Sequence, residues 1–131
     1  MSIVSCKPKV APISERIAKN WTVTLAREGS NFVFTQGAAN NVSPGYINFK
    51  IELQSGGTCV FIDFDGTHFT GQWELKDDTK LILKNLSPTP TGTSGTIEFT
   101  ISDFTDNTMT LTRTTTNPKT GNTINVYQMK G

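Results

Sequence analysis

The chain has 131 residues, which is enough for one domain with a buried core but not for two independent ones. Its 12 basic and 11 acidic residues leave a net charge of +1, which argues against a nucleic-acid-binding protein that acts through a broad basic face. Thr, Val and Ile number 38 against 17 for Ala, Leu and Glu, and this ratio excludes a helical bundle and predicts an all-β protein.

Residues 1–11 are predicted to form a tail or tether ahead of a domain at 12–131. The tail lacks the apolar core of about 7–15 residues that a secretory signal needs, and no apolar run along the chain is long enough for a membrane-spanning helix. Ile3-Val4-Ser5-Cys6 is similar to the end of a bacterial lipobox, in which Cys6 would be acylated and the protein would be held in the cell envelope, periplasm or extracellular space. The alternative is a tail with an incidental cysteine.

Residues 12–20 are the only predicted helix. Pro12 suits the first turn of a helix, and Ile13 and Ile17 lie four residues apart, on one face. Because the helix has only about two turns, packing rather than intrinsic propensity must stabilise it.

From Trp21 onward, apolar and polar residues alternate with a period of two, which is typical of an antiparallel sheet with one buried face. Short turns such as Gly56-Gly57 and Asp65-Gly66 separate the runs, and two longer connections span 36–45 and 87–95. Phe32 and Phe34 either extend the first strand or form a short strand of their own. The predicted strands are 21–28, 46–54, 58–64, 67–75, 80–86, 96–103, 108–116 and 122–129.

Sequential hairpins predict an up-and-down antiparallel meander, and eight strands close naturally into a barrel without free edges. In the last strand, either Ile124 and Val126 or Tyr127 and Met129 face inward. Cys59 and Phe61 fall on the face opposite Val60 and Ile62, so they form an exposed apolar spot unless a register slip or a bulge changes the face. We expect the following residues to line the interior: Phe49, Ile51, Ile62, Phe64, Phe69, Trp73, Phe99, Ile101, Met109 and Leu111.

Residues with reactive or metal-binding side chains are few. Asp63-Phe64-Asp65-Gly66 is similar to the opening of a calcium loop but lacks the later ligands, so we interpret it as a hairpin turn. Cys6, Cys59 and His68 do not have the spacing of a zinc site, and the spacing does not decide whether the two cysteines pair. No recognisable motif places a nucleophile near His68. We therefore expect no metal, no cofactor and no enzymatic activity.

Four segments carry a resemblance to a known family: Ala18-Lys19-Asn20-Trp21, the block from Phe49 to Leu75 with Gly71-Gln72-Trp73 after a hairpin turn, Lys80-Leu81-Ile82-Leu83, and the block at 101–111. Together they resemble the lipocalin-like domains of bacterial secreted lipoproteins, within the calycin group, over about residues 13–130. The resemblance implies an eight-stranded barrel that holds a small hydrophobic molecule. It also implies that an arginine from a late strand covers a tryptophan at the closed end, and Arg113 and Trp21 are the matching residues. In a competing interpretation, Arg113 faces the cavity and binds an anion.

Two functions follow from these expectations. The first is a lipocalin-like protein that binds an unidentified small hydrophobic molecule inside the barrel. The second is a structural or protein-interaction module with a filled barrel, because side chains fill the interior of an eight-stranded barrel. It would act through the open-end loops at 36–45 and 87–95. In both cases we expect a monomer that binds no nucleic acid.

Overall fold

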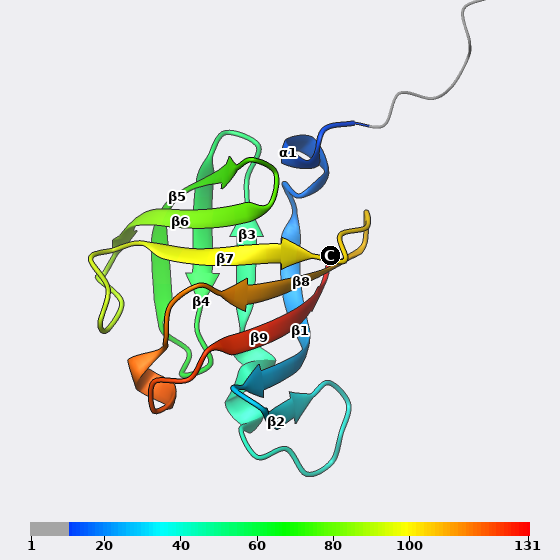
Figure 1. Cartoon of the computed structure of the whole chain (residues 1–131), viewed down its shortest axis with the longest axis vertical. Helices are drawn as coiled ribbons and strands as arrows, with labels where there is room; N and C mark the ends of the chain where they lie inside the picture. Colours follow the sequence, from blue (N-terminus) through cyan, green and yellow to red (C-terminus); the bar gives the residue numbers. More distant parts are fainter. Residues whose placement is uncertain (1–10) are drawn as a thin grey trace, which may run out of the picture.

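The computed structural model describes residues 11–131, so the candidate lipidation site at Cys6 lies outside the described residues. The described chain is an all-β barrel with one short α-helix near its start (Figure 1). In chain order its elements are α1 (Ile13–Arg16), β1 (Asn20–Glu28), β2 (Asn31–Thr35), the 3-10 helix η1 (Pro44–Asn48), β3 (Lys50–Leu53), β4 (Thr58–Ile62), β5 (His68–Lys76), β6 (Lys80–Ser87), β7 (Ile97–Ser102), β8 (Thr108–Arg113), the 3-10 helix η2 (Pro118–Thr120) and β9 (Asn125–Lys130).

Eight of the nine strands form a closed ring. Strands β3 to β9 each pair antiparallel with the next, and β1 pairs with both β3 and β9. The ring therefore has meander order, which confirms the predicted barrel. Strand β2 lies outside the ring and pairs only with the second half of β1, so Phe32 and Phe34 belong to a separate short strand.

The barrel has two unlike ends, which we call the helix end and the loop end (Figure 1). The helix end carries α1 together with the β3–β4 turn (54–57) and the β5–β6 turn (77–79). The loop end carries β2, η1, η2 and the long connection between β6 and β7.

Helix α1 is shorter than the sequence predicts because the chain turns into β1 at once. The indole Nε1 of Trp21 donates to the carbonyl oxygen of Ile17 at 2.8 Å, and the Lys19 amide donates to the same oxygen. These donors occupy a carbonyl that a longer helix would use for its own hydrogen bonds. Both Ile17 and Trp21 are fully buried, so this contact attaches the helix to the barrel.

Strand β4 turns its Cys59 and Phe61 side chains inward, at 2% and 4% exposure, and half-buried Ile62 lies on the outer wall. The expected interior position of Ile62 is therefore wrong. Both faces of this strand are apolar, so composition does not set its orientation. Its neighbour does: Phe61 lies opposite Phe69 of β5, and their rings stack at 5.6 Å between centroids.

The other departures from the alternating pattern occur at irregular points of the backbone. The register of β1 against β9 shifts between Val23 and Leu25, so Ala26 replaces Leu25 as the buried residue. The strand predicted at 46–54 begins only at Lys50, and Ile47 lies in η1 with 70% of its surface exposed. In the last strand Tyr127 and Met129 face inward, at 2% exposure each.

Candidate functional site

Aromatic rings in mutual contact fill the interior toward the loop end. Phe49 stacks on Tyr127 with their centroids 4.4 Å apart and meets Phe61 edge-on at 5.3 Å. Tyr46, brought in by η1, stacks on Phe64 at 5.1 Å. These are contact distances for aromatic pairs, so the rings form a packed core.

The predicted interior residues fall into three groups. Six are buried to 2% exposure or less: Phe49, Ile51, Phe69, Phe99, Met109 and Leu111. Three are partly buried and pack against the core: Phe64, Trp73 and Ile101. Ile62 lies outside, where it lines a surface pocket. The sequence pattern therefore selects core positions well, but it does not distinguish a cavity lining from a filled core.

A cluster of salt bridges at the loop end joins η2 to the turn between β4 and β5. The Lys119 ammonium lies 3.1 Å from an Asp63 carboxylate oxygen and 3.0 Å from one of Asp65. Partial burial opposes the charge on Lys119, but the two carboxylates hold its pKa above the usual value. Partial burial raises the pKa of Asp65, but hydrogen bonds from Thr67 and Lys119 more than offset this and lower it. The segment interpreted as a hairpin turn thus holds a lysine cation between its two carboxylates.

A second polar group lies deeper at the same end. The Tyr46 hydroxyl donates to Glu28 Oε2 at 2.6 Å, and burial raises the pKa of both Tyr46 and Tyr127. Arg113 is only 7% exposed, and it makes no hydrogen bond or ion pair with any of residues 11–131. Its Nε atom is fully inaccessible and unpaired. The loop end thus contains a buried cation near the phenol of Tyr127.

The structure does not bring Trp21 and Arg113 together. Trp21 lies at the helix end, because its neighbour Thr22 is aligned through Lys130 of β9 with Thr108, the first residue of β8. Arg113 is the last residue of β8, so it lies toward the loop end, away from Trp21. The cation over the Trp21 ring is instead Lys19, whose Nζ lies 5.6 Å from the ring centroid.

Reactive groups are protected or isolated. Burial raises the pKa of the Cys59 thiol to about 11, so it is protonated at neutral pH. His68 is exposed at the start of β5. Within residues 11–131, no three His, Cys, Asp or Glu side chains come together as metal ligands. The loop-end cluster can therefore hold charges and a fixed shape, and we assign no reaction to it.

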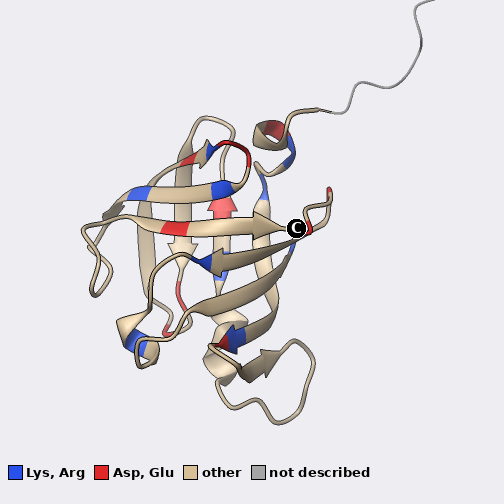
Figure 2. Cartoon of the chain, viewed as in Figure 1, with Lys and Arg blue, Asp and Glu red and all other residues tan. Residues whose placement is uncertain are grey.

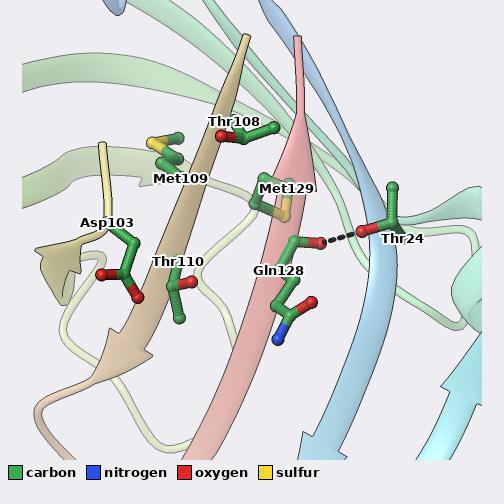
Figure 3. Close-up of a pocket in the computed structure, with 7 residues that line it drawn as sticks. All are labelled: Thr24, Asp103, Thr108, Met109, Thr110, Gln128 and Met129. Carbon is green, nitrogen blue, oxygen red and sulfur yellow. Dashed lines mark hydrogen bonds between the residues drawn. The ribbon is translucent and has the colours of Figure 1, made fainter. Parts of the chain in front are cut away.

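The surface pockets on the described part of the chain include the following three. One, of about 270 Å³, lies over β8, β9 and β1 and is rich in hydroxyl groups (Figure 3). Its lining includes Thr24, whose hydroxyl donates to the Gln128 carbonyl at 3.1 Å, and Asp103 from the segment after β7. A second, of about 340 Å³, lies beside Ile47 and His68. The third, of about 600 Å³, lies at the helix end.

The large apolar side chains that the structure exposes gather at the loop end. Phe32 in β2 is 63% exposed, and Val42 and Ile47, which flank the start of η1, are 78% and 70% exposed. Ile124, just before β9, is 38% exposed. In the view of Figure 2, positive and negative residues are interspersed over the strands.

Some residues of the loop end are not predictable from the sequence. Tyr46 follows a Pro-Gly pair, a turn signal, yet it is fully buried. Lys119 lies in a hairpin loop, and its two carboxylate partners are 54 and 56 residues away in sequence. For the burial of Tyr46, the only sequence signal is a tyrosine beside a turn. For the ion pairs of Lys119, the sequence carries no signal.

Comparisons of the chain with protein-family models, curated proteins and solved structures return no match. None of the helices in residues 11–131 has the length and apolar character to cross a membrane.

Proposed function

We propose that this protein is an interaction module whose filled barrel serves as a rigid scaffold and whose loop end binds another protein. The observation that carries the proposal is that Phe32, Val42, Ile47 and Ile124, the large apolar side chains exposed among residues 11–131, all lie at this end. Exposed apolar groups that gather on one surface are typical of interaction sites.

Two further features support the proposal. Strand β2 pairs only with β1, and on its other edge the Ser43 amide donates to the Val33 carbonyl while the Asn41 side chain bonds the backbone of Thr35, so the 36–45 loop is held in a fixed shape. The loops stand on a barrel whose aromatic core is close-packed, and loops on a rigid scaffold are common positions for binding residues.

The test compares proteins captured by the wild-type chain and by the double variant Phe32→Ser, Ile47→Ser. Ile82→Thr on the outer wall of β6 is the control, since it removes apolar surface away from the loop end. We expect a partner that the wild-type chain and the control retain and the double variant loses. If the double variant captures the same proteins as the wild-type chain, the proposal is wrong.

The resemblance to lipocalin-like domains favours a second candidate, a carrier of a small hydrophobic molecule, because the ring of eight strands is shared with such carriers. In this chain a ligand inside the barrel would have to displace contacting rings such as Phe49 and Tyr127. Native mass spectrometry of the purified protein, followed by titration with a fluorescent fatty acid, distinguishes the candidates. One lipid bound per chain would favour the carrier, and neither bound lipid nor saturable titration would favour the filled scaffold.

We also propose that the protein is attached to the bacterial cell envelope through an acylated Cys6. The support is the lipobox-like tetrapeptide that ends at this residue. Labelling of the gene product with radioactive palmitate in cells checks the proposal. We expect label in the wild-type protein and none in Cys6→Ser, and an unlabelled wild-type protein would contradict it.

A further inference from the structure

The cleft at the helix end is the largest of the three pockets, at about 600 Å³. It opens between α1 on one side and the β3–β4 and β5–β6 turns on the other, so three separate segments line it. It is a broad, open cleft, so a ligand would lie across it rather than be enclosed.

Trp73 forms a fixed apolar wall of this cleft. Its indole Nε1 donates to the Gln54 carbonyl at 2.8 Å, and its backbone amide donates to the Gly57 carbonyl at 2.9 Å. The ring is partly exposed, and Leu75 lines the cleft beside it. A Cβ at Gly56, another residue of the lining, would meet no atom within 4 Å, so it would stand in open space.

The charged residues that line the cleft are all acidic. Glu15 from α1, Glu74 from β5 and Asp78 from the β5–β6 turn line it, and none of its lining residues is basic. Glu74 lies 3.3 Å from Lys84, but Glu15 and Asp78 form no ion pair within residues 11–131. An apolar wall with an acidic rim is complementary to a cation that carries apolar groups.

We propose that this cleft binds a segment of a partner protein in which lysine or arginine flanks an apolar residue. The carboxylates come from both sides of the cleft, so two basic side chains of one peptide can meet Glu15 and Asp78 together. The apolar residue between them would contact Trp73 and Leu75. This site lies at the opposite end from the loop-end surface and does not depend on it.

The test uses the full chain and an acetylated, amidated peptide of sequence Lys-Leu-Lys-Leu-Lys, with Trp73 as the reporter. Trp21 is fully buried, so a change in tryptophan emission or in acrylamide quenching reports on Trp73. We expect saturable binding that protects Trp73 from acrylamide and weakens as salt rises. The same peptide with glutamate in place of lysine should not bind.

Two variants locate the site. Gly56 does not have a positive φ and lines the cleft, so Gly56→Phe adds a bulky ring to the lining without backbone strain and should abolish binding. Glu15→Gln with Asp78→Asn should weaken binding about tenfold, since one exposed ion pair is worth about two- to fivefold. Asp78 has a φ of 55°, which asparagine also tolerates. The double variant decides the question if Gly56→Phe does not fold.

Asp103→Asn is the matched control, because Asp103 is also an exposed acid with a positive φ but lines another pocket. It should bind like the wild-type chain, as should the loop-end variant Phe32→Ser, Ile47→Ser. Equal binding by the wild-type chain and the two cleft variants would overturn the proposal. So would lysine amide binding as tightly as the peptide, which would indicate a small-amine site. If the peptide binds only after Lys7 and Lys9 are changed to Gln, the occupant is this chain's own basic segment, and the proposal of a partner protein is also overturned.

Discussion

At the scale of single residues, Arg113 is the least satisfied side chain of the loop end. A buried charge is costly unless it is paired, and Arg113 has no partner within hydrogen-bond or salt-bridge distance among residues 11–131.

Replacing Arg113 with methionine tests this cost. Met keeps much of the length of the side chain and removes the charge, so we expect Arg113→Met to raise the free energy of unfolding by about 1 kcal/mol. Urea denaturation measures the change. If the variant instead loses stability by the same amount, the positive charge of Arg113 stabilises the folded state.

The Asp65–Lys119 contact makes stability depend on pH in two windows. The pKa of Asp65 is lowered from 3.8, so its contribution is present above that value and is lost as the pH falls through the lower, folded-state pKa. The pKa of Lys119 is raised from 10.5, so its contribution is complete below that value and is lost as the pH rises through the higher one.

Lys119→Met should therefore flatten the acid limb of the stability curve. We expect the free energy of unfolding of the variant to fall less steeply between about pH 4 and about pH 2 than that of the wild-type chain. Urea denaturation across this range measures the slopes. Lys80→Met is the control, because its contact with Glu98 is long, at 3.8 Å, and lies on the outer wall. Equal acid slopes in all three proteins would contradict the assignment.

At the scale of elements, the contact of β5 with β6 explains the glycine of the Gly71-Gln72-Trp73 motif. The β5–β6 register shifts between Thr70 and Gln72, and Asn85 opposite has a positive φ of 54°. A Cβ at Gly71 would lie 2.5 Å from the Lys84 carbonyl oxygen. Backbone atoms cannot yield as a flexible side chain can, so this position requires glycine.

We expect Gly71→Ala to lower the free energy of unfolding by about 1–3 kcal/mol, as overpacking against a backbone does. Gly56→Ala is the matched control, since nothing lies within 4 Å of its Cβ, and it should be neutral or slightly stabilising. Thermal and urea denaturation compare the two. A Gly71→Ala protein as stable as the control would show that β6 moves aside without cost.

At the scale of the whole molecule, the eight-stranded meander is predictable because alternating apolar residues and short turns are local signals that all predict antiparallel strands. The outer threonines, such as Thr70 and Thr100, add to this prediction, since threonine favours strands and is compatible with exposure to water. What depends on contacts distant in sequence is less predictable. Strand β4 has apolar residues on both faces, and only Phe69 of the next strand shows that Phe61 faces inward. Whether the interior is empty or filled depends on how rings such as Phe49 and Tyr127 meet, which no local pattern encodes.

The ring predicts an order of local stabilities. Strands β4 and β5 have a neighbour on both sides, whereas β2 pairs only with β1. We expect the hydrogen-bonded amides of β2 to exchange with deuterium at least about tenfold faster than those of β4 and β5. Hydrogen exchange followed by mass spectrometry of peptides measures this. Equal protection in β2 would indicate that the loop contacts on its outer edge, such as Ser43 N to the Val33 carbonyl, protect it as well as a second paired strand does.

Closure of the ring depends on one pairing between strands far apart in sequence. Strand β9 pairs with its sequence neighbour β8 on one side and with β1, about a hundred residues earlier, on the other. Wherever β1 and β9 are not paired, they are the two edges of an open sheet, and such edges pair readily with other chains. The β1–β9 pairing is therefore what protects this chain from self-association, although the folded ring has no edge.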